Sequence, residues 1–258
     1  MTPRAGYGDG MTKVFVHGNP ETPAIWSGLV AELNRRGVDD IVTLAPPGFG
    51  APSPKGWGAT QSEYLGWLAR ELAAFDEIDL VGHDWGAGHV YGIIAGGSVR
   101  VRTWAADCAG LLHPDYVWHD AAQGWQTPGL GEQMVAGMAA MDIDTMITAF
   151  GSMGITETIV REMKPWVNDE MARCVLALYR SAAQPAMREL GERFVATAPP
   201  DGLVIIAEND HYAGPHTMHE EMASAVGAEV AHLHGVGHWW MIEDPVAGAD
   251  MLTAHWAG

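Results

Sequence analysis

The sequence is poor in cysteine and in lysine. Its two cysteines, Cys108 and Cys174, lie far apart and show neither metal-binding nor redox spacing, so a reduced, cytoplasmic setting is the default expectation. The lysines are Lys13, Lys55 and Lys164, and the formal charge is -18. Such an acidic balance disfavours nucleic acids and anionic membrane surfaces as partners.

Long apolar runs are also missing. The N-terminus has no run that would serve as a signal peptide or membrane anchor, and no later segment reaches about 18 uninterrupted apolar residues. Hydrophobic residues nonetheless make up 48% of the 258 residues. This is enough for the core of one large domain with an inserted subdomain. The sequence leaves the oligomeric state open, with a homodimer as one option.

Strand and helix patterns alternate along the chain, which predicts an α/β fold with a parallel sheet of about six strands flanked by helices. Residues 111–195 give no convincing strand and are rich in Met, Trp and helical spacing. They are interpreted as a helical cap inserted after the fourth strand, with residues 1–110 and 196–258 forming the core domain. The predicted strands are 13–16, 40–44, 78–81, 101–106, 202–207 and 229–233, and the predicted helices are 24–36, 61–75, 87–95, 217–226 and 246–256.

The segment Gly82-His83-Asp84-Trp85-Gly86 lies between the third strand and a helix. Glycines on both sides permit a sharp turn in which the middle residue is raised above the end of the sheet. Serine usually occupies that middle position as a nucleophile. Asp84 in its place suggests a carboxylate that forms an ester with carbon. The alternative is that Asp84 caps the following helix.

A carboxylate nucleophile needs a base that activates water to split the ester. His238 follows the last strand and is the candidate, with Asp210, after the fifth strand, as the acid that orients it. Asp107, at the end of the fourth strand, is the alternative acid. Negative charge on the ester oxygen needs donors, for which backbone N–H groups of Trp85 and of the turn His17-Gly18-Asn19-Pro20 are suitably placed.

These motifs resemble those of the α/β-hydrolases with an aspartate nucleophile, the epoxide hydrolases and haloalkane dehalogenases. The resemblance rests on HGNPE at 17–21, GHDWG at 82–86 and GHWWMIEDP at 237–245, and covers nearly the whole chain. It implies the α/β-hydrolase fold, a small apolar substrate, and chemistry that needs no metal or cofactor. The family usually has two strands before the one that ends in His-Gly, but only about eleven residues precede it here. Six strands are therefore expected.

The two families differ in how they stabilise the leaving group, since an epoxide oxygen needs a proton. Leu178-Tyr179-Arg180 lies 31 residues before Asp210 and resembles the tyrosine–arginine pair of the epoxide hydrolase cap. The segment from Trp125 to Glu132 resembles a second cap motif, Q-x-P-G-x-x-E. The first ring-opening tyrosine of that family is replaced by Gly124, which leaves Tyr116 and His119 as candidate substitutes.

A halide instead needs N–H donors, and Asn19 and Trp85 occupy the positions of the two dehalogenase donors. Epoxide hydrolases also commonly carry a tryptophan at the place of Trp85, and Asn19 has an ordinary alternative role as a turn residue. Epoxide hydrolysis is the leading prediction, haloalkane dehalogenation the second, and a non-catalytic ligand-binding protein of this fold the third.

Overall fold

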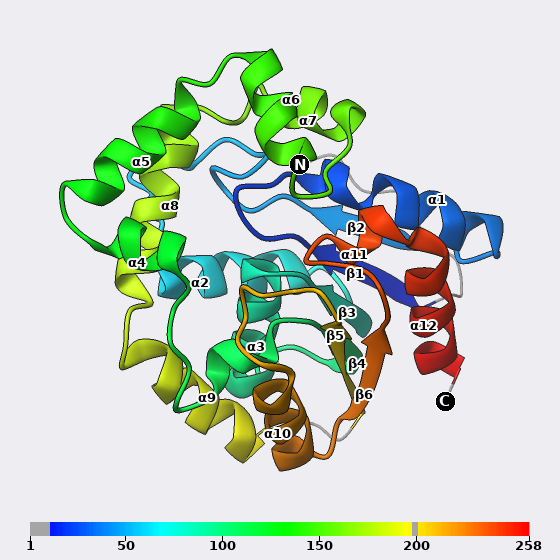
Figure 1. Cartoon of the computed structure of the whole chain (residues 1–258). Helices are drawn as coiled ribbons and strands as arrows, with labels where there is room; N and C mark the ends of the chain where they lie inside the picture. The colour runs from blue at the N-terminus through cyan, green and yellow to red at the C-terminus, as the bar shows by residue number, and fades with distance from the viewer. Residues whose placement is uncertain (1–10, 198–200, 258) are drawn as a thin grey trace.

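The computed structural model describes residues 11–197 and 201–257, and six strands among them form one parallel sheet (Figure 1). The strand order is β2-β1-β3-β4-β5-β6, so β3 and β4 are central. The predicted parallel sheet of six strands is confirmed, and each predicted strand limit is within one residue of the observed one. The strands are β1 (Thr12–Val16), β2 (Ile41–Leu44), β3 (Ile78–Gly82), β4 (Val101–Ala106), β5 (Gly202–Ala207) and β6 (Glu229–Leu233).

Helices cover both faces of the sheet (Figure 1). A single 3₁₀ turn, η1 (Pro23–Trp26), precedes α1 where the sequence predicted one continuous helix. Thr60 and Glu63 form a capping box that fixes the start of α2. On one face lie α1 (Ser27–Arg35), α11 (Trp240–Glu243) and α12 (Pro245–Ala257); on the other lie α2 (Gln61–Leu72), α3 (Trp85–Gly96), α9 (Ala186–Thr197) and α10 (His216–Val226).

Between β4 and β5, the described residues contain helices and no strand. Most of α9 falls within the predicted cap, 111–195, yet the helix packs against α3 on the flank of the core. The helices that lie outside the two flanking layers follow the short turn η2 (Ala109–Leu112). They are α4 (Asp120–Gln126), α5 (Leu130–Ala139), α6 (Ile143–Gly151), α7 (Glu157–Met163) and α8 (Asp169–Ser181).

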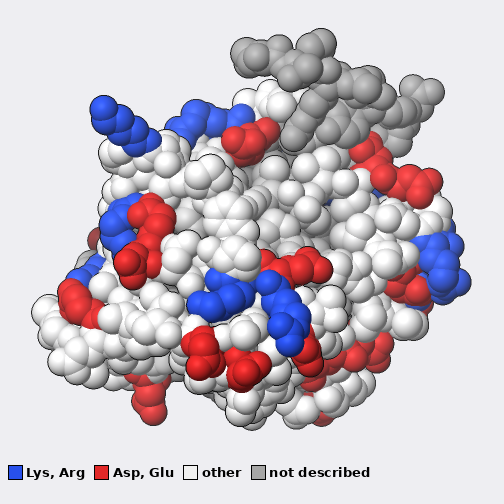
Figure 2. Space-filling model, turned by 90° about the horizontal axis from the view of Figure 1, so that it is seen from above, with Lys and Arg blue, Asp and Glu red and all other residues white. Residues whose placement is uncertain are grey.

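No single helix in the described ranges is long and apolar enough to cross a membrane. The pair Leu130–Ala139 and Ile143–Gly151, bent by 112°, meets the criterion together by length and composition alone. The surface seen in Figure 2 carries charges of both signs, and several basic side chains lie beside acidic ones.

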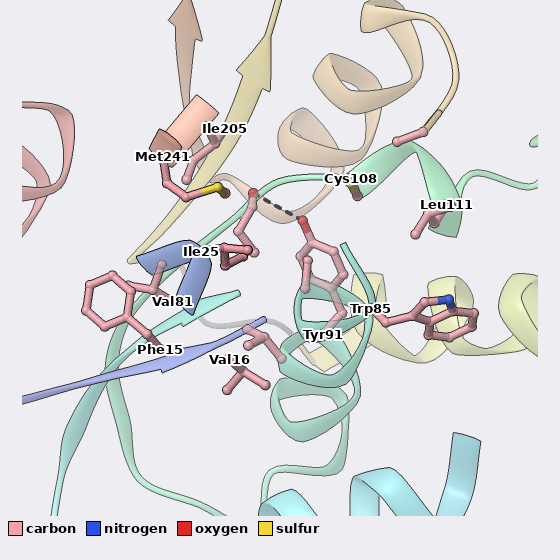
Figure 3. Packing of buried hydrophobic residues seen from close by; sticks show 14 of the residues in the cluster. Phe15, Val16, Ile25, Val81, Trp85, Tyr91, Cys108, Leu111, Ile205 and Met241 are labelled. Atoms are coloured by element: carbon pink, nitrogen blue, oxygen red, sulfur yellow. Dashed lines mark hydrogen bonds between the residues drawn. The ribbon is translucent and has the colours of Figure 1, made fainter. Parts of the chain in front are cut away.

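The sheet and its flanking helices share one apolar core. Figure 3 shows Phe15, Val81 and Ile205 of the sheet with Ile25 and Met241 from the flanking segments, all of them buried. The Tyr91 hydroxyl of α3 donates to the backbone carbonyls of Ala106 and Asp107, at 3.3 and 2.6 Å. This contact ties α3 to the end of β4, and it is beside that end that the candidate site lies.

One carboxylate, Asp79, is fully buried within the sheet. Arg102 of β4 donates to both of its oxygens, at 2.8 and 2.6 Å, and Lys13 of β1 lies 2.9 Å away. Burial alone would raise the pKa of Asp79, but the hydrogen bonds from Arg102 and Lys13 outweigh it and lower the pKa below its ordinary value. Asp79 therefore joins β1, β3 and β4 through charge-assisted hydrogen bonds.

We expect Asp79→Asn to lower the free energy of unfolding at neutral pH by about 2–4 kcal/mol, because two cations lose a buried partner. A depressed carboxyl pKa contributes stability that is present above the pKa of the unfolded chain and is lost as pH falls through the folded-state pKa. Urea unfolding should therefore show the difference from wild type shrinking in acid.

Glu77→Gln is the matched control, because the Glu77–Arg100 pair is exposed. Its effect should stay within about 0.5 kcal/mol. Equal losses for the two variants would contradict the structural role assigned to Asp79.

Candidate active site

The predicted site residues meet at the carboxyl ends of the strands. From β1 the chain passes outward to β2 and then returns to β3 on the other side of β1. The crevice at such a switch point is where ligands bind in open parallel sheets. The turn of residues 17–20 follows β1, Asp84 follows β3, Asp210 follows β5 and His238 follows β6.

Asp84 occupies a strained turn. Its φ and ψ are 51° and -122°, a conformation that costs free energy for any residue other than glycine. The turn packs closely against the end of β1, and only a glycine fits at position 86. A Cβ on Gly86 would lie 2.0 Å from the carbonyl oxygen of Val16. The Asp84 side chain makes no capping hydrogen bond to α3, so the helix-cap interpretation is wrong. The backbone N–H of Asp84 instead donates to Asp107 Oδ1 at 2.9 Å.

The Asp84 carboxylate is held at a defined place. Its Oδ1 accepts the backbone N–H of Asn19 at 2.9 Å, and its Oδ2 lies 3.7 Å from His238 Nε2. Gly18 makes room for it, since a Cβ there would be 2.1 Å from Oδ1. Burial raises the pKa of Asp84 to about 6 against the opposing effect of His238. The group is therefore ionised at neutral pH yet poorly solvated, which favours nucleophilic attack.

The predicted oxyanion donors are only partly in place. Asn19 supplies the backbone N–H, but the Gly18 N–H donates to Glu21 Oε2 at 3.1 Å instead. Among the described residues, no other backbone N–H reaches the Asp84 carboxylate, and that includes Trp85. His17 is fully buried and does not line the cavity described below; burial lowers its pKa to about 4.

His238 and Asp210 form a hydrogen-bonded pair. The Nδ1 atom of His238 lies 2.8 Å from Asp210 Oδ2, which leaves Nε2 facing Asp84. Burial opposes protonation of His238, but the Asp210 charge raises its pKa above the ordinary value. The pKa of Asp210 is lowered, since the neighbouring His238 outweighs the effect of burial. The backbone N–H of Tyr212 fixes the other Asp210 oxygen at 2.8 Å.

Asp107, the alternative acid, is engaged elsewhere. Its Oδ2 lies 2.5 Å from His83 Nδ1 and accepts the Trp240 indole N–H at 2.8 Å. Its Oδ1 receives the Asp84 backbone N–H. The structure thus pairs His238 with Asp210 and gives Asp107 to a separate buried cluster, which sequence reasoning missed.

A cavity of about 270 Å³ lies between the strand ends and the helices α4, α5, α6 and α8. The side chains of Asn19, Asp84 and His238 line it from the core. Neither amide atom of Asn19 has a hydrogen-bond partner within the described part of the chain. Sequence reasoning also missed Tyr212 and Trp239, which the loops after β5 and β6 bring to the cavity. The remaining lining is largely apolar and includes Trp125, Met134, Met138, Met141, Phe150 and Met153.

Tyr179 of α8 lines the same cavity. Its ring packs against Trp125, with centroids 4.7 Å apart, and edge-on against Trp85 at 5.2 Å. Burial and the Asp84 charge raise the pKa of Tyr179 well above its usual range, so the hydroxyl keeps its proton. Trp85 stacks on Trp118 at 5.9 Å and is not among the cavity-lining residues; it belongs to the buried hydrophobic cluster shown in Figure 3.

The two candidate substitutes for the missing tyrosine differ in position. The Tyr116 hydroxyl donates to the Tyr212 carbonyl at 2.8 Å, and Tyr116 does not line the cavity. His119 does line it. Its Nδ1 accepts the Ala122 N–H at 3.3 Å, so the ring proton is on Nε2, and burial lowers its pKa to about 4. At neutral pH His119 is therefore a neutral hydrogen-bond donor.

The described residues contain two groups of potential metal ligands, and within each group the ligand atoms lie within 4.8 Å of one another. One is Glu21, His83 and His238, and the other is Cys108, Asp210 and His238. Both include His238, whose nearest carboxylate is already its hydrogen-bond partner. The absence of a metal and of a cofactor stays a prediction.

We expect Asp84→Asn to stabilise the protein by about 2 kcal/mol above pH 6, because an amide carries no buried charge. A raised carboxyl pKa means that the folded state binds a proton more tightly than the unfolded chain, so wild-type stability falls as pH rises from about 4 to about 6. Thermal unfolding across this range should show the variant's advantage appearing as pH rises. Equal unfolding temperatures at all pH values would contradict the raised pKa.

Comparison with known proteins identifies the family. The Alpha/beta hydrolase family matches residues 14–251. Similar solved structures include haloalkane dehalogenase DbeA from Bradyrhizobium elkani (18% identity, TM-score 0.74, covering 98% of this chain and 93% of that one). Another is haloalkane dehalogenase DatA from Agrobacterium tumefaciens (19%, 0.73, 96% and 89%). Likeness at this identity shows a shared fold. No curated protein matches the sequence. The chain belongs to the alpha/beta hydrolase family.

Proposed function

We propose that this hydrolase opens an epoxide on a small apolar substrate through an ester with Asp84, and releases a vicinal diol. The observation that carries the proposal is the position of Tyr179, whose protonated hydroxyl shares one apolar cavity with Asp84 and His238. An epoxide oxygen gains negative charge as its C–O bond breaks, and a positioned proton donor is what it requires.

In the first step an Asp84 oxygen attacks an sp³ carbon of the epoxide. The free Oδ2 is the attacking atom, since Oδ1 is held by the Asn19 N–H. The C–O bond breaks, and the departing oxygen takes the proton of Tyr179. The product is a hydroxyalkyl ester of Asp84 and a tyrosinate.

In the second step His238 Nε2 takes a proton from water, and the resulting hydroxide attacks the ester carbonyl carbon. The oxyanion forms on Oδ1, where the Asn19 N–H stabilises it. Its collapse releases the diol and restores the Asp84 carboxylate. Asp210 stabilises the imidazolium until its proton returns to Tyr179, so the net reaction consumes one epoxide and one water.

His119 is the better candidate for a second donor to the epoxide oxygen. It lines the cavity as a neutral imidazole with its proton on Nε2. The Tyr116 hydroxyl, in contrast, already donates its hydrogen bond to a backbone carbonyl. Two donors would share the developing charge, as two tyrosines do in the epoxide hydrolases that the sequence resembles.

Haloalkane dehalogenation is the second candidate. The buried, unpartnered amide of Asn19 in the cavity favours it, because a halide leaving group needs N–H donors. Against it stands Trp85, the expected second donor, which lies outside the cavity lining and close enough to the Tyr179 hydroxyl to affect its pKa.

The first test is to trap the ester. His238→Phe removes the base, so the intact mass of the variant should rise on incubation with a panel of epoxides and bromoalkanes. An epoxide adds its whole mass, and a bromoalkane adds its mass less hydrogen bromide, so the adduct also distinguishes the two reactions. The double variant with Asp84→Asn is the control and should gain no mass. A folded His238→Phe protein that forms no adduct would favour a ligand-binding protein.

The second test concerns the leaving group. Tyr179→Phe keeps the packing against Trp125 but removes the proton donor, so the rate of epoxide opening should fall about 100-fold. Asn19→Ala should spare epoxide opening and weaken bromide release. Single-turnover formation of the ester in the two variants measures both effects. If Tyr179→Phe does not slow ester formation and Asn19→Ala does, dehalogenation becomes the better assignment.

A further inference from the structure

Beneath the candidate site lies a buried cluster of Glu21, His83 and Asp107. The side chains of Glu21 and His83 are fully buried, and Asp107 is 3% exposed. The two ring nitrogens of His83 face a carboxylate each: Nδ1 lies 2.5 Å from Asp107 Oδ2, and Nε2 lies 3.2 Å from Glu21 Oε1. The indoles of Trp239 and Trp240 donate to Glu21 Oε1 and Asp107 Oδ2, at 2.5 and 2.8 Å.

With both carboxylates ionised, this geometry requires a charged His83. A neutral imidazole would direct a lone pair at one of the two carboxylates, whereas an imidazolium donates to both. The electrostatics agree. Burial opposes the charge, but the Asp107 and Glu21 carboxylates raise the pKa of His83 well above its ordinary value. The same contact with His83 lowers the pKa of Asp107 and of Glu21 despite burial. The cluster therefore holds two carboxylates and one cation.

Two members of the cluster accept a backbone N–H from a loop of the candidate site, and the third, His83, lies beside the His238 ring. Glu21 Oε2 accepts the Gly18 N–H, next to the Asn19 N–H that binds the Asp84 carboxylate. Asp107 Oδ1 accepts the backbone N–H of Asp84. Trp239 and Trp240 directly follow His238, and the His83 ring lies 4.5 Å from the His238 ring.

We propose that Glu21, His83 and Asp107 are positioning residues: their ion-paired cluster fixes the nucleophile, the oxyanion donor and the base relative to one another, and the His83 imidazolium keeps a second positive charge off His238. The catalytic consequence of this cluster rests on the proposed function, but the cluster itself does not.

Charged groups from several neighbouring loops act on His238. Asp210 and Asp84 favour its protonation, and His83 opposes it. The titratable groups around it are Glu21 after β1, His83 and Asp84 after β3, Asp107 and Cys108 after β4, Asp210 and Tyr212 after β5, and His119 at the start of α4. A charge removed from the cluster must therefore move the titration of His238, with a sign set by that charge.

The experiment follows the histidine rings by NMR in ¹³C- and ¹⁵N-labelled full-length protein without substrate. His238→Phe assigns the His238 signals, and His83→Gln assigns those of His83. In wild type, both ring nitrogens of His83 should carry protons at neutral pH. Glu21→Gln, which removes a negative charge, should move the His238 midpoint to lower pH. His83→Gln, which removes the cation, should move it to higher pH.

Trp240→Phe is the matched control, because it removes a donor to Asp107 without a change of charge. It should lower the unfolding temperature and leave the His238 midpoint in place. Shifts of Glu21→Gln and His83→Gln in the same direction, or no shift, would overturn the proposal. Should His83→Gln fail to fold, the direction of the His238 shift in Glu21→Gln decides. The ester-hydrolysis step of each variant should show the same displacement of its acid limb as the NMR midpoint.

The two proposals fail separately. Opposite NMR shifts in a protein that attacks neither epoxides nor bromoalkanes would leave the cluster standing and remove the proposed function. Unchanged NMR midpoints in an active enzyme would overturn the proposal for the cluster and leave the proposed function standing.

Discussion

The hydrogen bond from the Asp84 backbone N–H to Asp107 is the interaction on which the site depends. The turn at Asp84 is strained, with φ at 51°, and a strained turn persists only where its surroundings hold it. Asp107 is able to do so because His83 and Trp240 fix its other oxygen. The conformation that exposes the carboxylate is therefore maintained by charged residues buried beneath it. These residues do not line the cavity.

The same arrangement explains how four carboxylates coexist in one buried region. Asp107 and Glu21 share the His83 cation, and Asp210 has His238. Asp84 has one backbone N–H and only a distant imidazole, and it alone among the four has a raised pKa. The least satisfied carboxylate is the one that lines the cavity, and carboxylates with perturbed pKa values are concentrated at functional sites.

The sequence predicted the sheet and the triad geometry because both follow from local patterns. Apolar runs define strands, and motifs placed after strands must meet at one edge of a parallel sheet. The sequence patterns do not predict which way the side chains point. HGNPE and GHDWG contain Glu21 and His83, but no spacing rule says that these two residues pair with each other beneath Asp84. Nor does the sequence reveal that α9 packs on α3 and not with the other helices of the predicted cap. It also does not reveal that the Tyr116 hydroxyl donates a hydrogen bond to a backbone carbonyl.

The choice between leaving groups also depends on side-chain direction. Asn19 and Trp85 are adjacent to the nucleophile by motif, and motif alone gives a halide site two donors. The Trp85 indole instead stacks on Trp118 and makes a T-shaped contact with Tyr179, and Tyr179 lines the cavity whereas Trp85 does not. Burial and the Asp84 charge raise the pKa of Tyr179 well above its usual range, and they outweigh the opposing effect of Trp85. The Tyr179 hydroxyl therefore keeps its proton at neutral pH, and this retained proton is the reason that an oxygen leaving group is proposed in place of a halide.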